Sequence, residues 1–171
     1  RTAFSTKEQT LTPGVASVYL DRFLNGATIY PRNFYFVAIK GRPESIRPES
    51  SYWIDTDEEQ ARESKPPYKQ IRLSGRVDGR FLFRTAISKH VLPFIVLDPA
   101  FVILPVVVES RKIGIRTSDQ LEGEGFRETG KWMKEAENHW TLHRGRKSAR
   151  MSLYEWLDYN GKLTSQDLSI P

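Results

Sequence analysis

The clearest alternation of apolar and polar residues runs from residue 70 to residue 77. Ile71, Leu73 and Val77 point to one side of an extended chain. The side chains that point to the other side are polar or basic: Gln70, Arg72, Ser74 and Arg76. This pattern predicts a strand with an apolar back, which packs on a core, and a basic front that can donate hydrogen bonds.

Other apolar stretches predict the rest of a sheet. Residues 34–39 are aromatic and β-branched, which is typical of a buried strand. Further strands or buried apolar stretches are expected at residues 52–54, 81–83, 94–97, 101–108 and 113–115. The last of these is the expected return arm of a hairpin, and residues 41–51 read as a turn-rich loop.

Helical spacing dominates the C-terminal third. Between residues 126 and 143, Thr129, Met133, Ala136 and Trp140 fall on one stripe of a helix. Shorter helices are expected at residues 15–24, 57–63 and 152–159, the last with Ser152 as its N-cap. The class is therefore α+β: a polar tail at residues 1–12, a strand-rich, mixed-sheet domain at 13–116, and a helical part at 117–171 that packs on it.

Composition narrows the function classes. The chain has 171 residues and no cysteine, which excludes disulfide frameworks, cysteine-zinc sites and thiol nucleophiles. No apolar run approaches the roughly 18 residues that span a bilayer. Because the chain begins with Arg1 and shows no secretion signal, we expect a cytoplasmic piece of a longer protein.

Positive charge is unevenly distributed. The net charge is +5, yet residues 65–89 alone hold seven basic residues and one acid. A second cluster, Arg144, Arg146, Lys147 and Arg150, contains no acid, whereas residues 55–63 and 119–137 are acidic. A segregated basic face is what a polyanion such as nucleic acid requires.

One enzymatic alternative is a Mg²⁺-dependent endonuclease. Asp98 precedes an apolar stretch that ends in Glu109, and two carboxylates at such positions can hold Mg²⁺. Arg111 stands where such enzymes place a lysine, and arginine activates water poorly.

Two further motifs are weak. Lys65-Pro66-Pro67-Tyr68 imitates the Asn-Pro-Pro-Tyr motif of amino-group DNA methyltransferases, but lysine has no acceptor for the target amine. His139 and His143 have a spacing that suits zinc, but no third histidine or cysteine is near in sequence.

DNA binding explains the remaining polar residues best. Arginine and asparagine can pair bidentately with guanine and adenine, and basic residues can contact phosphates. The candidate DNA-binding residues are Arg32, Asn33, Gln70, Arg72, Arg76, Arg111, Lys112, Arg144, Arg146, Lys147 and Lys162. We expect the residues between 32 and 76 to read base edges in double-stranded DNA and the others to contact phosphates.

Two segments carry a family resemblance. The segment LNGATIYPRNFYFV at residues 24–37 contains the string GA-x-I-x-P-R-x-F-x-x-V, and SLYEWLDYNGKLTSQ at residues 152–166 contains LDYNGKLTSQ. Both strings resemble the region after the catalytic domain in large adenine-specific DNA methyltransferases of the type IIG restriction–modification and phage-exclusion type. Residues 81–83 and 90–94 look like the family's middle portion.

The resemblance implies a target-recognition region similar to TaqI-like C-terminal specificity domains. In such enzymes a separate domain binds S-adenosylmethionine and methylates adenine N6, and that catalytic methyltransferase domain would be this chain's partner. None of the methyl-donor or catalytic motifs maps onto this sequence, so the chain itself is expected to need no cofactor and to be inert. A third alternative is a protein-interaction module in which the helix carrying Trp132 and Trp140 docks on a partner.

Overall fold

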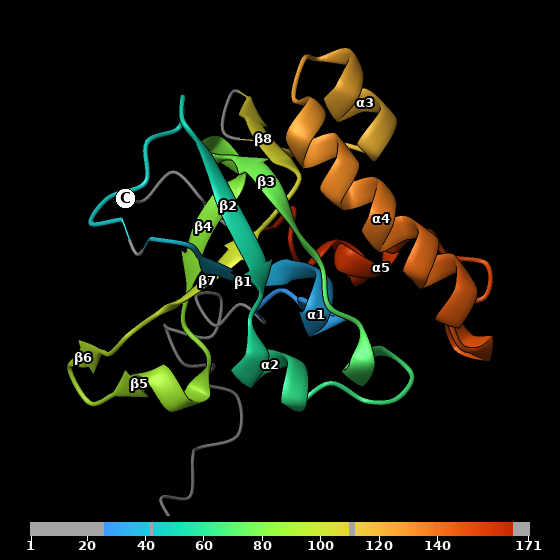
Figure 1. The fold of residues 1–171 in the computed structure, drawn as a ribbon. Coiled ribbons are helices and arrows are strands. Elements are labelled where there is room, and N and C mark those ends of the chain that lie inside the picture. The colour runs from blue at the N-terminus through green and yellow to red at the C-terminus, as the bar shows by residue number, and fades with distance from the viewer. Residues whose placement is uncertain (1–25, 42, 110–111, 166–171) are drawn as a thin grey trace, which may run out of the picture.

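A five-stranded antiparallel sheet forms the centre of the computed structural model, which describes residues 26–41, 43–109 and 112–165 (Figure 1). The strands are β1 (Phe36–Ile39), β2 (Ser51–Thr56), β3 (Ser74–Asp78), β4 (Leu82–Thr85) and β7 (Ala100–Ile103), in the order β3-β2-β1-β7-β4. Two small hairpins stand apart from it: β5 (Val91–Leu92) with β6 (Ile95–Val96), and β8 (Val106–Glu109) with β9 (Lys112–Ile115).

Helices precede, interrupt and follow the sheet. The α-helices are α1 (Arg32–Tyr35), α2 (Glu58–Arg62), α3 (Ser118–Gly123), α4 (Arg127–His143) and α5 (Leu153–Leu157). Short 3₁₀ turns are η2 (Tyr68–Gln70), η3 (Gly79–Phe81), η4 (Ser88–His90), η5 (Arg146–Ser148) and η6 (Tyr159–Gly161). This arrangement confirms the α+β class. No described helix is long and apolar enough to cross a membrane.

Helix α4 is joined to the sheet by its buried stripe (Figure 1). The Trp132 indole lies over Gly75 of β3, and its Nε1 donates a hydrogen bond of 2.9 Å to the carbonyl oxygen of Phe34. The Thr129 hydroxyl accepts a bond from the amide of Asp78 and donates one to its carboxylate. The predicted stripe is confirmed, and Trp132 and Trp140 are almost completely buried. These two tryptophans are therefore not available as contacts for a partner protein, because the chain's own core covers them.

Side chains cap the N-termini of two short helices, and the second of these caps was predicted. Asp57 caps α2 by accepting a bond from the amide of Gln60. Ser152 caps α5 and exchanges bonds with Glu155 in a capping box. The hairpin that ends at residue 115 is also confirmed.

Three local predictions differ from the structure. Residues 32–35 form a helical turn instead of the start of a strand, and β3 begins only at Ser74, although Ile71, Leu73 and Val77 are buried as the alternation indicated. Residues 94–97 are exposed on a hairpin rather than buried. The expected tail at 1–12 and helix at 15–24 lie outside the described residues.

Candidate nucleic-acid interface

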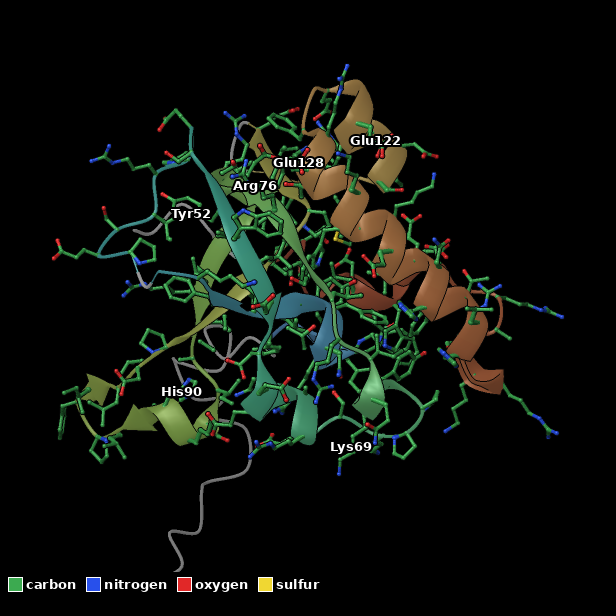
Figure 2. All side chains as sticks on the ribbon, viewed as in Figure 1. Tyr52, Lys69, Arg76, His90, Glu122 and Glu128 are labelled. Carbon is green, nitrogen blue, oxygen red and sulfur yellow. The ribbon has the colours of Figure 1, made fainter. Side chains whose placement is uncertain are left out.

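Two basic segments that are distant in the sequence meet at one end of the molecule. The ring of Tyr68 stacks on Trp140 at 6.1 Å between centroids and contacts the edge of His143 at 6.2 Å. This packing brings the loop at residues 65–70 beside the C-terminal end of α4, and Figure 2 labels Lys69 there. We call the cations of the two segments the basic end surface: Lys65, Lys69, Arg144, Arg146, Lys147 and Arg150.

The chain after α4 turns back and directs most of its cations outward. The indole Nε1 of Trp140 and the guanidinium of Arg144 both donate to the carbonyl oxygen of Met151, at 3.0 and 3.1 Å. Ser148 is buried and bonds to the carbonyl oxygen of Gly145. Between these anchors Arg146 and Lys147 are exposed, as is Arg150. The fold thus holds the loop while leaving the charges accessible.

Acidic residues are missing from both segments of this surface. Residues 64–71 and 138–151 contain no Asp or Glu, and none of the six cations forms an ion pair within the described part of the chain. Cations at the C-terminal end of a helix are also stabilised by its dipole. The result is a group of six cations that form no ion pair among the described residues, although Arg144 shares a cleft with Glu137 and Asp119.

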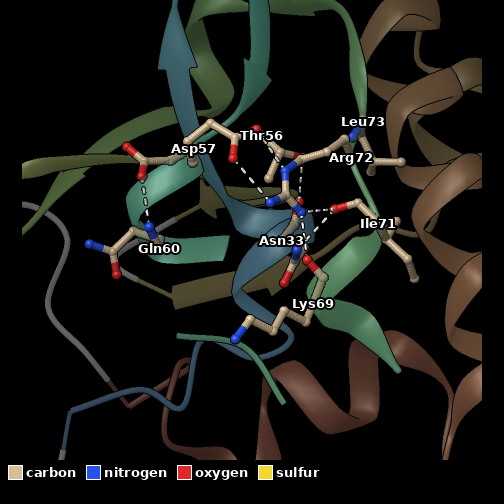
Figure 3. Close-up of polar contacts among 9 residues, drawn as sticks. Asn33, Thr56, Asp57, Gln60, Lys69, Ile71, Arg72 and Leu73 are labelled. Atoms are coloured by element: carbon tan, nitrogen blue, oxygen red, sulfur yellow. Dashed lines mark hydrogen bonds and ion pairs between the residues drawn. The ribbon is translucent and has the colours of Figure 1, made fainter. Parts of the chain in front are cut away.

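Asn33, predicted to read bases, is instead a structural residue. Its side chain is completely buried, and its amide donates a hydrogen bond of 2.9 Å to the carbonyl oxygen of Ile71 (Figure 3). The backbone carbonyl oxygen of Asn33 accepts a hydrogen bond from the hydroxyl of Thr56. The prediction for Asn33 is wrong, because a side chain that connects α1 to the segment before β3 cannot reach a base edge.

Two of the predicted base-reading arginines pair with a glutamate of helix α2 or with Glu63, which follows it. Arg72 forms a bidentate pair with Glu58 at 2.7 and 3.0 Å, and this carboxylate raises the pKa of the Arg72 side chain (Figure 3). Arg32 bonds to Gln60 at 2.8 Å and pairs with Glu63. Each guanidinium would have to leave its carboxylate before it could contact DNA.

The other two predicted readers are separated from each other. Arg76 is exposed on β3, with its guanidinium 5.4 Å from the ring centre of Trp53 on β2. Gln70 is not on a strand, because it ends η2 directly after Lys69. Gln70 therefore adjoins the basic end surface, and the continuous basic strand front that the alternation predicted does not form.

The remaining candidates divide between two ends of the molecule. Lys112 lies opposite Glu109 in the backbone register of the β8–β9 hairpin. This hairpin lies far from the end of α4 (Figure 1). Arg111 lies outside the described residues. Lys162 follows η6, and this turn is connected to α4 by ring contacts of 5.6 Å from Trp140 to Trp156 and from Trp156 to Tyr159. Arg144, Arg146 and Lys147 thus come together with Lys65 and Lys69, which were not singled out from the sequence. The aromatic residues next to each basic segment, Tyr68 and Trp140, were the sequence signal that could have predicted that the two segments pack together.

The nuclease carboxylates do not form a site. Asp98 lies before β7 with a φ of +40°, whereas Glu109 ends β8 in a different sheet and pairs with Arg116 at 3.0 Å. The rings of His139 and His143 stack on each other within an aromatic cluster. Within residues 26–41, 43–109 and 112–165, no three His, Asp or Glu side chains are grouped as metal ligands.

Tyr68 of the Pro-Pro-Tyr segment is part of the core, where its ring stacks on Trp140, and is not exposed for stacking on a DNA base. Its side chain is 5% exposed, and burial raises the pKa of its hydroxyl to about 12. It also contacts Phe34 edge-on at 5.6 Å, so the motif supports the basic end surface from below. Comparison of the chain with protein-family models, with curated proteins and with solved structures gave no match.

Proposed function

We propose that this chain binds double-stranded DNA through the basic end surface, as the target-recognition region of an N6-adenine DNA methyltransferase. The observation that carries the proposal is the meeting of two acid-free basic segments at the end of α4. The link to a methyltransferase rests on the resemblance of residues 24–37 and 152–166 to that family. S-adenosylmethionine and the transfer of the methyl group would belong to the enzyme's catalytic domain.

The number of cations predicts the salt dependence of binding. Each phosphate that a protein neutralises contributes about 0.9 to the slope of log affinity against log salt. If all six cations of the basic end surface contact phosphates, the slope is about −5, and affinity falls roughly a thousandfold between 50 and 200 mM salt. This part of the affinity is independent of sequence.

Sequence discrimination requires a side chain that reaches a base edge. Gln70 is exposed beside Lys69, and its amide can pair with N6 and N7 of adenine in the major groove. In this arrangement Lys69 and the η5 loop set the position on the duplex, and Gln70 contributes to the choice of sequence. A base contact of this kind contributes about 1–3 kcal/mol on the cognate site.

The test is DNA binding by anisotropy over a range of salt concentrations. We expect R146A and K147A each to weaken binding to every duplex alike and to reduce the slope by about one. K131A is the matched control, because Lys131 is an exposed lysine of α4 three turns away that pairs with Glu128. Equal losses in K131A and K147A would refute the placement of the interface, and loss-free R146A and K147A variants would refute the proposal.

A further inference from the structure

An apolar hairpin projects from the molecule without packing on it. We call residues 91–97, which include β5 and β6, the apolar arm. Phe94 at its tip is fully exposed, and its other large aliphatic residues are each 45–54% exposed: Val91, Leu92, Ile95, Val96 and Leu97. Figure 1 shows the arm standing away from the sheet, below β7. Its strands pair only with each other among the described strands.

The exposed surface of the arm is apolar, which is unusual for a hairpin that remains exposed to solvent. A two-stranded hairpin is marginally stable by itself, and its strands here have two residues each. Phe94 occupies the left-handed region at a φ of 68°, where glycine or asparagine is usual. A continuous exposed apolar stretch of this kind marks an interaction surface.

A cleft of about 410 Å³ opens beside the base of the arm. His90 and Asp98, which flank the arm directly, both line it. Seven apolar residues of the sheet and the neighbouring loops line it: Val37, Ala38, Ile39, Pro43, Pro99, Ala100 and Phe101. The rest of the lining is polar or charged, with Asp57, Glu59, Gln60 and Arg84 beside His90 and Asp98. The cleft is large enough for a phenyl ring, and Phe101 offers an aromatic partner for it.

We propose that two copies of this chain associate by exchanging apolar arms, so that Phe94 of each copy enters the cleft of the other. Because donor arm and acceptor cleft are adjacent on one molecule, a twofold axis between them satisfies both contacts at once. The complementary cleft on the same chain is what favours a second copy over an unrelated protein as the occupant.

The area is sufficient for a stable dimer. The exposed side chains of one arm offer on the order of 500 Å². Two arms together with the two cleft walls that they cover reach the range of about 1,200–2,000 Å² that specific interfaces bury. The dimer does not depend on DNA binding, because α2 lies between the arm and the end of α4 (Figure 1).

The first test is the oligomeric state of the whole chain by sedimentation equilibrium between 1 and 200 µM. We expect a dimer whose Kd rises at least a hundredfold in F94D. L142D is the matched control, since Leu142 is a 76% exposed apolar residue of α4, and it should remain dimeric with an unchanged Kd. Circular dichroism of each variant verifies the fold.

A complementation test separates arm-in-cleft exchange from pairing of the arms with each other. A38R obstructs the cleft at an exposed position but leaves the arm intact. F94D and A38R should each be monomeric alone, yet associate when mixed, because one intact arm then meets one intact cleft. A monomeric wild type at 200 µM, a dimeric F94D, or a mixture that stays monomeric would each overturn the proposal.

Discussion

The bond between Thr129 and Asp78 allows the attachment of α4 to the sheet to be measured. T129V keeps the shape of the buried side chain but removes the hydroxyl that accepts from the Asp78 amide at 3.0 Å and donates to its carboxylate at 2.7 Å. A hydrogen bond to a charged group contributes about 1.5–3 kcal/mol, and a half-buried amide left without a partner costs up to about 1–3 kcal/mol. We expect the free energy of unfolding to fall by about 2–4 kcal/mol.

Urea denaturation measures this loss, with the slope of the transition unchanged. T129S is expected to lose only about 1 kcal/mol, because it keeps the hydroxyl and deletes one methyl group. T141V is the matched control, since Thr141 is exposed on the same helix. If T129V and T141V are equally stable, or if T129S is as damaging as T129V, the hydroxyl does not stabilise the packing of α4 on β3.

Three further predictions concern packing and pH. N33A should lower the free energy of unfolding by about 1–3 kcal/mol in urea melts, because it removes the buried hydrogen bond from the Asn33 amide and leaves the Ile71 carbonyl with only its bond from Arg72, while the folded variant binds DNA as before. G79A should destabilise by about 1–3 kcal/mol in the same assay, since its Cβ would lie 2.2 Å from a backbone oxygen; G123A, which meets open space, should not destabilise. The pKa of Tyr68 is raised from 10 to about 12, so stability present below pH 10 is lost as the pH rises to 12. Denaturation curves of Y68F should lack that share of the loss, and an equal loss in Y68F would contradict the assignment.

Local sequence signals predicted those elements whose pattern is complete within one segment. The stripe of α4 and the Ser152 cap follow from periodicity and short-range hydrogen bonding, and the structure agrees. Burial of the apolar arm was predicted wrongly, because an apolar run indicates that a surface avoids water but not which surface covers it.

The contact of the candidate residues with DNA stays a prediction. Arg146 and Lys147 are exposed and Arg144 is half-buried, and no acid lies near them along the chain. The ion pairs of Arg32 and Arg72 were not foreseen, because their partners Glu63 and Glu58 are 31 and 14 residues away in the sequence and are brought beside them by folding. A cluster of basic residues in the sequence therefore predicts a basic surface only where folding brings no acidic side chain beside it.

The strand order has a consequence for how the chain is made. Strands β1 to β3 are neighbours in sequence and can pair as soon as they emerge, but β4 has no neighbour until β7 inserts between it and β1. A nascent or truncated chain that stops before residue 100 would present an open edge on β1, and such edges template aggregation. Soluble fragments of this protein should therefore extend beyond Ile103.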